Sequence, residues 1–349
     1  MYWVKGELLN EIDAAGVDPS AQLIRTAQPG LFDRIEWFGR VIQNVPAGTT
    51  PIIARAASEA SLAWLFLMRS ANGAAVGLSN WYCMAFRPVY AGNPDDPRKL
   101  AMLIAMARRL RSARPRISSI SLSPVPRADG NSAMLTKAFT RAGWRAVVQQ
   151  SSTSWTANVD GLSFDDYWAA RPGQLRSTWQ RKMGKATFET QIYSDFNQDA
   201  WAEYESVYAD SWKPSEGSPS FLLDFAQSEA VSGCTRIGIT RIDGVAIAAQ
   251  FWTVENDTAY IHKLAHRENS IALSPGTILS AALFRHVIDV DHVKTIDFGT
   301  GNDAYKADWM DVCMPLDTII IYNLGTLKGV WGAFRAWIKA LVKGDHEQQ

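Results

Sequence analysis

The sequence of 349 residues has few cysteines, no long apolar run and no excess of charge of either sign. Cys83, Cys234 and Cys313 lie far apart and are odd in number, which argues against a disulfide framework or a zinc motif and favours a reducing cytoplasm. A membrane span needs about 18 apolar residues in a row, and no stretch of the sequence reaches that length without a charge. The stretch MYWVKGELLNEIDAAG also lacks the apolar core and the small-residue cleavage site of a signal peptide.

The charge balance argues against a further class of function. The chain has 35 Lys and Arg residues against 35 Asp and Glu residues, so bulk positive charge gives it no general affinity for nucleic acid, although a local patch stays open. The basic run ARRLRSARPR at 107–116 is expected to be the solvated face and C-terminal turn of a helix, where cations suit the helix dipole. With 47% hydrophobic residues the composition is that of a globular protein, and the length predicts two domains.

The C-terminal half has the clearest pattern of elements. Strands are predicted at 235–242, 245–254, 258–264 and 293–299. A helix begins near residue 275, because apolar residues recur there at helical spacing up to Val290. Since this helix connects the last two strands, we expect those strands to run parallel.

The N-terminal half repeats this order of elements without repeating the sequence. Strands are predicted at 62–68, 74–86, 117–123 and 144–149, and helices at 97–112 and 131–143. The predicted fold class is therefore α/β with mixed sheets, in two similar lobes at residues 1–160 and 161–349.

An amphipathic helix is predicted close to the C-terminus, at 329–343. Trp331, Phe334, Ile338 and Leu341 recur there at helical spacing. We expect this helix to dock against the body of the protein, with contact to a membrane surface as the alternative.

The stretch ALSPGTILSAAL places a Ser-Pro-Gly break directly before the helix that begins near residue 275. The first turn of a helix has unpaired N–H groups and a partial positive charge, so it attracts phosphates where the backbone is accessible. Gly276 removes the Cβ that would obstruct the approach, Pro275 fixes φ, and Ser274 can cap the helix or donate its hydroxyl. An anion site is one interpretation of this break, and an ordinary capped helix is the other.

The order of these motifs resembles the GNAT superfamily of acyltransferases. The branch that it resembles most is that of the cellulose-biosynthesis-type (CelD/BcsL) acetyltransferases, whose relatives are the Fem-type peptidyl transferases. The segments that carry the resemblance are Tyr260, Ser274-Pro275-Gly276, Asp297-Phe298-Gly299, Tyr305-Lys306 with Trp309, Ser211–Lys213 and Arg181-Lys182. The second basic residue of the last pair is commonly an arginine in the family, so Lys182 keeps the charge but loses bidentate phosphate geometry.

The resemblance implies two tandem GNAT-like lobes, the first of them degenerate. It also implies transfer of an acyl group from acetyl-CoA or another acyl-CoA to an amine or hydroxyl. The pantetheine arm would pass Leu264, between two diverging strands, and the pyrophosphate would lie on the amides of Gly276, Thr277 and Ile278. The matching helix of the first lobe begins DDPRK, whose acidic residues would repel phosphate, so one cofactor per chain is expected.

Four residues are candidates for the chemistry of transfer. Acyl transfer from a thioester needs a base for the acceptor, a stabilised oxyanion and a proton for the leaving thiolate. Asp297 lies inside an apolar strand as a candidate base or orienting group, Tyr305 is a candidate acid, and Lys306 is a candidate for oxyanion stabilisation. His262 lies on the strand that would border the acyl group. For each residue a structural role is the alternative: a hydrogen bond, ring packing, a solvated surface lysine or a structural histidine.

The neighbours of His262 limit what it can do. His262 and Lys263 are expected to point to opposite faces of their strand, so at most one of them faces a cleft. His262 and His266 span the end of a strand, not a helix, and no metal site is expected. Direct attack in a ternary complex is the preferred mechanism.

Four further residues are candidates for substrate binding: Arg181, Lys182, Trp212 and Lys213. The expected acceptor is a polysaccharide precursor, a sugar or an amine metabolite, with no nucleic-acid partner and with peripheral association with a polysaccharide-synthesis complex left open. Two alternatives keep the fold. One is a Fem-type transferase that takes an aminoacyl group from transfer RNA, and the other is a non-catalytic CoA-binding or scaffold protein of an exopolysaccharide system.

Overall fold

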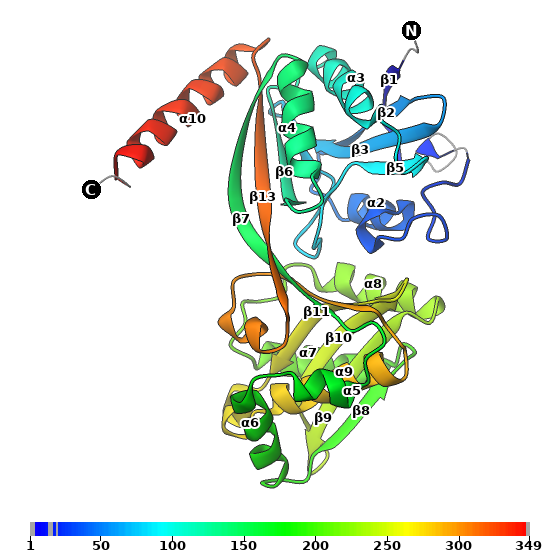
Figure 1. The fold of residues 1–349 in the computed structure, drawn as a ribbon, viewed down its shortest axis with the longest axis vertical. Helices are drawn as coiled ribbons and strands as arrows, with labels where there is room; N and C mark the ends of the chain where they lie inside the picture. The colour runs from blue at the N-terminus through cyan, green and yellow to red at the C-terminus, as the bar shows by residue number, and fades with distance from the viewer. Residues whose placement is uncertain (1–3, 13–16, 19, 347–349) are drawn as a thin grey trace. The chain divides into compact units, whose positions relative to one another are not determined.

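The computed structural model describes residues 4–12, 17–18 and 20–346, with side chains described as far as residue 339. The chain forms two compact units (Figure 1). Unit 1 comprises Met1–Ser152 and Met314–Gln349, and unit 2 comprises Thr153–Cys313. The strands belong to one mixed 13-stranded sheet, and each unit has covering helices and a hydrophobic core of its own, which confirms the predicted α/β class.

Unit 1 has the strand order β1-β2-β3-β4-β6-β13-β7, with β5 paired to β3. Its strands are β1 (Lys5–Leu9), β2 (Thr50–Ala57), β3 (Ser61–Arg69), β4 (Ala74–Gly77), β5 (Val89–Gly92), β6 (Ser119–Pro126), β7 (Trp144–Asn158) and β13 (Val312–Asn323). Its helices are η1 (Leu31–Asp33), α2 (Ile35–Gln43), α3 (Lys99–Ser112), α4 (Asn131–Arg141) and α10 (Leu327–His346). The last residues of β7, from Thr153 onward, belong to unit 2.

Two features of unit 1 differ from the sequence prediction. The strand predicted at 74–86 ends at Gly77, because Asn80 forms a turn in which its side chain accepts a hydrogen bond from the Tyr82 N–H (3.0 Å). The second difference is the domain boundary: residues 314–349 belong to unit 1, not to the second lobe. The reason is that β13 pairs antiparallel with β6.

A buried carboxylate fixes β13 in unit 1. Asp317 accepts hydrogen bonds from Arg127 (2.5 Å) and from the Ser132 hydroxyl (2.7 Å). Burial alone would raise the pKa of Asp317, but these two hydrogen bonds and the arginine charge lower it.

Unit 2 has the order β7-β12-β11-β10-β9-β8. Its further strands are β8 (Glu189–Tyr193), β9 (Thr235–Ile242), β10 (Val245–Glu255), β11 (Thr258–His266) and β12 (Thr295–Thr300). Its helices are α5 (Phe164–Ala169), α6 (Gly173–Met183), α7 (Gln198–Ala209), α8 (Pro219–Val231), η2 (Glu268–Leu273), α9 (Pro275–Asp289) and η3 (Ala304–Asp308). The meander β9-β10-β11 is antiparallel and β11-β12 is parallel, which confirms the prediction for this region.

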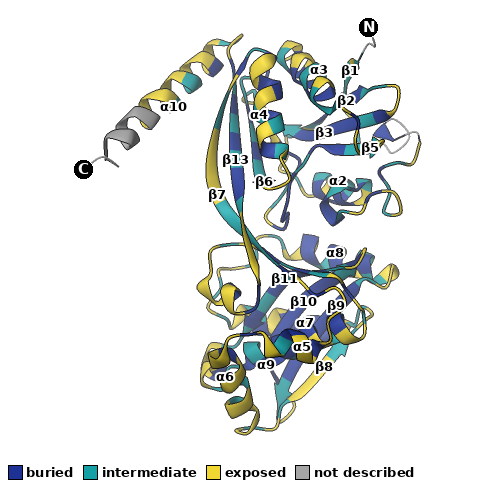
Figure 2. Ribbon diagram, in the orientation of Figure 1, coloured by how far each residue is buried: buried dark blue, intermediate teal, exposed yellow. Residues whose placement is uncertain are grey.

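Helices cover both faces of the sheet of unit 2, whose strands β9, β10 and β11 are largely buried (Figure 2). Phe251 packs against Trp201 of α7, while the next residue, Trp252, packs edge-on against Phe284 of α9. The side-chain alternation of β10 therefore places α7 and α9 on opposite faces. On β9, a Cβ at Gly238 would come within 2.9 Å of both Leu279 and Leu283, so the absence of a side chain lets α9 lie close to the sheet.

Helix α10 does not bury its apolar face in the described part of the chain. Its small residues lie against the body of unit 1: a Cβ at Gly332 would come within 2.7 Å of the Tyr322 ring. The large apolar side chains Trp331, Phe334 and Ile338 are exposed, so the expected docking of this face is wrong for them, while the side chain of Leu341 lies outside the described residues. No helix among the described residues is both long enough and apolar enough to cross a bilayer.

Candidate functional site

The candidate site lies where β11 and β12 of unit 2 part. Their parallel pairing comprises only Thr258 with Thr295, Ala259 with Ile296, and Tyr260 with Asp297. Beyond these pairs β11 continues for six residues paired to β10, and β12 continues along β7. The divergence predicted between these two strands is therefore present.

A β-bulge in β11 begins directly after the last common pair. Along β10, Trp252 is paired with Ile261 and Phe251 with Lys263, so His262 is the extra residue. A bulge bends its strand and increases the local twist, and this turns β11 away from β12.

The bulge also corrects an expectation about side-chain direction. His262 stacks on Phe251 (ring centroids 5.2 Å apart), on the face that α7 covers, and its Nε2 lies 2.8 Å from the Thr253 hydroxyl. Lys263 lies on the same face, where its ammonium forms an ion pair with Glu216 (2.8 Å) and lies over the ring of Tyr208 on α7. The prediction that His262 and Lys263 point to opposite faces is wrong, because the extra residue interrupts the alternation of the strand.

Strand β12 is irregular at the same level. Its register with β7 shifts between Asp297 and Thr300, and Gly299 has a φ of 67°, a conformation that a glycine adopts without steric cost. The Asp297 carboxylate accepts a hydrogen bond from the Gly299 N–H (2.8 Å), so one of its oxygens supports this turn.

Lys306 completes the irregular end of β12. Its ammonium is buried and donates to the carbonyls of Phe298 (3.2 Å) and Thr300 (2.6 Å). Burial lowers its pKa, while Asp303 and Asp297 oppose that shift. Lys306 therefore satisfies backbone carbonyls of the bulged segment and is not the solvated lysine considered as its alternative.

Helix α9 lies on the face of the sheet opposite to α7, and its start is the second part of the candidate site. Ser274 is the N-cap residue, with a left-handed φ of 53° and no side-chain capping hydrogen bond, and Pro275 occupies the first turn. A non-glycine residue in this region costs about 1 kcal/mol or more, and such strain often accompanies a functional site. The side chain of Gln250 holds the helix to β10 through the Ser280 hydroxyl (2.8 Å).

Only one of the three amides predicted to hold a phosphate is unpaired among the described residues. Thr277 and Ile278 both donate to the Ser274 carbonyl, at 3.0 and 3.3 Å. The Gly276 N–H has no acceptor in the described chain. An anion at this helix start would therefore bind first to Gly276, and the Ile278 side chain is buried in the core.

The other predicted binding residues lie around this helix start. A Cβ at Gly276 would be 3.3 Å from His266, and the ring of His266 lies 4.3 Å from that of Trp212. Lys182, at the end of α6, donates to the carbonyl of Ala272 just before the helix. Leu264 is half-buried against the core beside α9, and Arg181 is exposed.

The equivalent helix of unit 1 has its first turn occupied. At the start of α3, the buried Asp96 carboxylate accepts hydrogen bonds from the Arg98 N–H and the Arg98 side chain, both at 2.9 Å. These bonds, with one from Ser58, lower the pKa of Asp96. Asp96 of the DDPRK stretch thus occupies this helix start with a carboxylate of the chain itself.

On the face of the sheet that α7 covers, a cavity of about 350 Å³ contains several titratable groups. Its lining residues are Trp201, Tyr204, Glu205, Tyr208, Ala209, Lys213, Ser215, Glu216, Pro219 and Leu222. Burial and the charges of Lys263 and Lys306 lower the pKa of Lys213 to about 8, although Asp303 and Glu216 oppose this shift. A lysine of this kind is partly neutral near neutral pH and can accept a proton.

Tyr305 lies on η3, edge-on to Phe298 with ring centroids 5.8 Å apart. Burial raises the pKa of its phenol, and Asp303 adds to the rise. It therefore stays protonated over the physiological range and can donate a proton. No group of three or more metal-ligating side chains occurs among the described residues.

The structure brings together many, not all, of the predicted site residues. Lys182, Trp212 and Gly276 lie around the start of α9, and Lys213 is close enough to Lys306 for their charges to interact. His262 is packed among aromatic rings, edge-on to Phe225. Two lining residues of the cavity, Tyr208 and Glu216, were not predicted. Their sequence signal is weak, because Glu216 lies in an irregular loop and Tyr208 is one of several aromatic residues in a helix.

Comparison with known proteins agrees with this geometry. Residues 137–307 match the family model described as "Acetyltransferase (GNAT) domain". No curated protein sequence matches the chain.

Three solved structures share the fold at low identity. FemX is 10% identical, covers 91% of this chain and 98% of its own, and superposes with a TM-score of 0.64. A tandem GNAT protein from the clavulanic acid biosynthesis pathway is 11% identical, with the same coverages and a TM-score of 0.53. The C-terminal domain of a putative lysylphosphatidylglycerol synthetase from Agrobacterium fabrum is 12% identical over 77% of this chain and 83% of its own, with a TM-score of 0.51. The fold is therefore that of two tandem GNAT-like lobes.

The pKa of Lys213 is a testable property of the cavity. We expect its dimethylated, isotope-labelled side chain to titrate near pH 8 in an NMR experiment. Lys294 is the control, because Asp257 raises its pKa, and its signal should titrate well above that of Lys213. Replacing Lys263→Met should move the Lys213 midpoint upward, since a neighbouring positive charge is removed. A Lys213 midpoint equal to that of Lys294 would show that the cavity does not perturb this group.

Proposed function

We propose that the protein is an acyl-CoA-dependent acyltransferase that acts on an amine or hydroxyl acceptor by direct attack in a ternary complex. The observation that carries this proposal is the parting of β11 and β12 at two adjoining bulges, beside a helix that begins with an unpaired Gly276 amide. We propose that the parted strands leave room for the arm of the donor and that the start of α9 binds its phosphate.

Several residues fit an acyl-CoA at this opening. The Gly276 amide and the positive end of α9 would hold a phosphate of the donor. The absence of a side chain at Gly276 keeps the approach to this amide free, because a Cβ there would lie against His266. Lys182 is close enough to add positive charge, and Leu264 offers an apolar side chain along β11. When bound, the donor supplies an acyl group activated as a thioester.

The cavity beside Lys213 is the proposed acceptor site. Lys213, partly neutral, would take the proton that the attacking amine or hydroxyl loses. Glu216 holds Lys263 in place through their 2.8 Å ion pair and contributes a carboxylate to the same wall. Tyr305, protonated and half-exposed, is the proposed proton donor to the leaving thiolate. Lys306 and Asp297 are proposed to position the end of β12, and Lys306 to add positive charge near the reacting oxygen.

We propose a polar acceptor with an apolar face, such as a sugar, a saccharide precursor or an amine-bearing metabolite. The cavity combines the rings of Trp201, Tyr204 and Tyr208 with the charged groups of Lys213 and Glu216. Aromatic walls with a few converging polar groups suit a ligand of this kind. The order of the Ser-Pro-Gly, Asp-Phe-Gly and Tyr-Lys segments supports placing the chain with the cellulose-biosynthesis-type acetyltransferases and an exopolysaccharide pathway.

The choice of donor is tested first by binding. We expect calorimetry to detect binding of coenzyme A to the full chain. Gly276→Glu should weaken it about tenfold or more, because the new carboxylate projects where a phosphate binds. Gly39→Glu adds the same charge in unit 1, where a Cβ at Gly39 has no atom within 4 Å, and should leave the affinity within about twofold.

Two results of this experiment would contradict the proposal. Absence of coenzyme A binding by the folded protein would exclude an acyl-CoA donor, and a protein that then co-purifies with transfer RNA in a ribonuclease-sensitive manner would be a Fem-type transferase. Equal loss of affinity in Gly276→Glu and Gly39→Glu would place the ligand somewhere other than the start of α9.

Turnover tests the role of Lys213. Release of free thiol from acetyl-CoA, measured with a panel of amino sugars, sugar nucleotides and amines, should rise as the pH passes about 8, because the neutral amine is the active form. Lys213→Met should lower the rate by about 100-fold and remove this pH dependence, with unchanged coenzyme A affinity. Lys294→Met, on the surface of unit 2, is the control and should keep the wild-type rate.

A Lys213→Met variant with the wild-type pH profile would contradict the assignment. Binding of coenzyme A without turnover of any acceptor would favour the scaffold alternative.

A further inference from the structure

Positive charge is segregated in the sequence even though the whole chain is neutral. The segments 97–128, 130–159 and 318–344 hold 15 of the 35 Lys and Arg residues and no Asp or Glu. They include α3, α4 and α10 up to residue 344. This concentration of charge is unrelated to the site in unit 2 and needs its own account.

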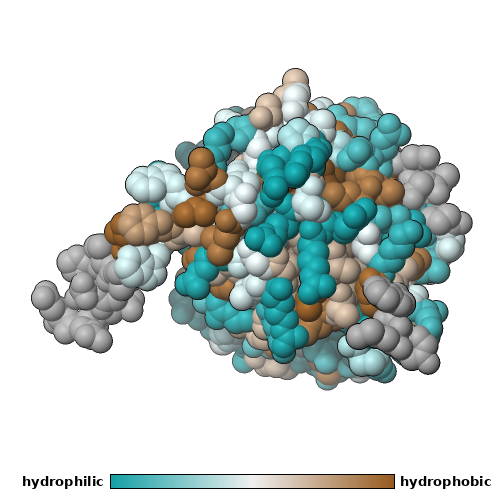
Figure 3. All heavy atoms as spheres, turned by 90° about the horizontal axis from the view of Figure 1, so that it is seen from above, coloured by the Kyte–Doolittle hydropathy of each residue, from teal (hydrophilic) through white to brown (hydrophobic). Residues whose placement is uncertain are grey.

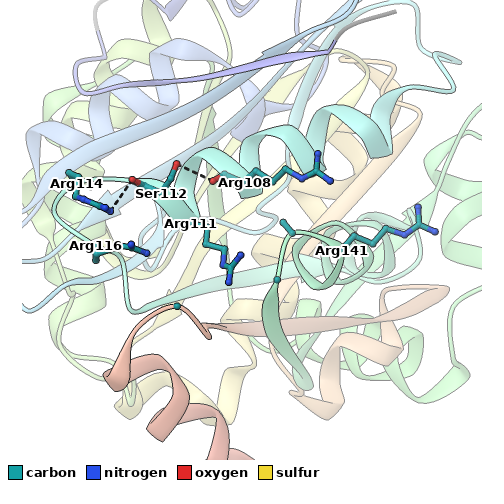
Figure 4. Close-up of a pocket in the computed structure, with 9 residues that line it drawn as sticks. Arg108, Arg111, Ser112, Arg114, Arg116 and Arg141 are labelled. Atoms are coloured by element: carbon teal, nitrogen blue, oxygen red, sulfur yellow. Dashed lines mark hydrogen bonds between the residues drawn. The ribbon is translucent and has the colours of Figure 1, made fainter. Parts of the chain in front are cut away.

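Five arginines from these segments line one hollow of about 750 Å³. They are Arg108, Arg111, Arg114, Arg116 and Arg141. Figure 4 shows Arg111 projecting from the end of α3 toward the start of α10, with Arg114 and Arg116 on the loop that follows α3. Gly325, two residues before α10, also lines the hollow. The hollow and the base of α10 are therefore continuous.

The described residues supply no anion for this hollow. Within the described residues, none of its five guanidinium groups pairs with a carboxylate; Arg114 donates only to the carbonyls of Ser112 and Ala113. The Arg111 Nε is buried without a hydrogen-bond partner in the described chain. The lack of a Cβ at Gly143 leaves room for the guanidinium of Arg111, which a Cβ there would approach to 2.8 Å. A helix C-terminus explains one or two cations here, but not five without counter-charges.

Helix α10 adds an exposed apolar face beside the hollow. The rings of Trp331, Phe334 and Trp337 lie in contact, with centroids about 6 Å apart, and Trp331 is 60% exposed. The exposed apolar side chains of this helix are Leu327, Val330, Trp331, Phe334, Trp337 and Ile338. Lys328, Arg335 and Lys339 follow one another at helical spacing along its flank. Figure 3 shows the apolar side chains along the protruding helix next to hydrophilic ones on the body.

We propose that this face of unit 1 docks on the surface of an anionic phospholipid bilayer. The aromatic and aliphatic side chains of α10 insert among the upper acyl chains, and the arginines of the hollow bind lipid phosphates. An amphipathic helix with large aromatic residues on one side and cations on its flank binds membranes in this way. The helix is attached to the body through small residues such as Gly332, so its large apolar residues are free to face a lipid surface.

Charge complementarity and side-chain type favour an anionic lipid surface over a nucleic acid or a second copy of the chain. A nucleic acid would use the arginines and could stack on Trp331 and Trp337, but it gains little from exposed Leu327, Val330 and Ile338. A second copy of the chain could cover the apolar face, but it would bring another set of unpaired arginines to the same place. A bilayer with anionic headgroups satisfies both the charged and the apolar parts.

The test is flotation of the full-length chain with vesicles. We expect binding to vesicles of equimolar phosphatidylglycerol and phosphatidylcholine, at least about tenfold weaker binding to pure phosphatidylcholine, and loss of binding in high salt. The charge variant is Arg114→Glu/Arg116→Glu, both on exposed positions. Its control, Arg176→Glu/Lys294→Glu, makes the same change of net charge on unit 2. The apolar variant is Trp331→Ser, with the exposed Trp81→Ser as its control.

The proposal requires that both test variants lose about tenfold or more in binding and that both controls keep it. Binding to phosphatidylcholine as strong as to the anionic vesicles would overturn it, as would equal losses in test and control variants. The absence of vesicle binding together with tight binding of RNA would identify a nucleic-acid surface instead. A dimer in light scattering that Trp331→Ser dissociates would show that a second copy covers α10.

Discussion

The parting of β11 and β12 after Tyr260 and Asp297 is the constraint on which the site in unit 2 depends. Two strands of one sheet separate only if the backbone groups left behind find other partners. On β12 the buried ammonium of Lys306 serves this purpose by donating to two carbonyls. On β11 the extra residue His262 turns the strand away, and its ring packs among aromatic side chains. His262 and Lys306, which resemble catalytic groups in the sequence, thus support the parting of the two strands.

The two units share one arrangement of strands and connecting helix but differ at the start of that helix. In both, a helix connects strands that run parallel, β4 with β6 in unit 1 and β11 with β12 in unit 2. In unit 1 the start of this helix is occupied by Asp96, whereas in unit 2 it has the left-handed Ser274 and the unpaired Gly276 amide. Unit 1 instead concentrates unpaired positive charge and an exposed apolar helix. We therefore propose that unit 2 binds a small anionic donor and that unit 1 binds an extended anionic surface.

Sequence patterns predicted much of unit 2, because its elements are local and regular. The strands at 235–242, 245–254 and 258–264 and the helix that follows are present within two residues of the predicted limits. The glycine at the helix start and the divergence of the neighbouring strands were also predictable, from helix-end chemistry and from the resemblance to the GNAT superfamily. In these regions the alternation and helical periodicity of apolar residues coincide with the true elements.

Other features depend on contacts between distant residues, which periodicity does not contain. The bulge at His262 breaks the rule that neighbouring strand residues point to opposite faces, and nothing in "YIHKLAH" marks it. Strand β13 returns to unit 1 through pairing with β6 and the hydrogen bonds of Asp317. Glu216 enters the cavity from an irregular loop. The apolar face of α10 predicts docking in a protein, and only the structure shows its small residues in contact with the body.

Hydrogen exchange of backbone amides, measured with and without coenzyme A, tests the central claim most directly. If an acyl-CoA arm lies between the parted strands, the ligand should slow exchange at residues 261–266 and 298–300 and at Gly276, while α3 and α10 keep their rates. If bound coenzyme A leaves exchange at 261–266 and 298–300 unchanged, no part of the ligand lies between the two strands and the claim is contradicted.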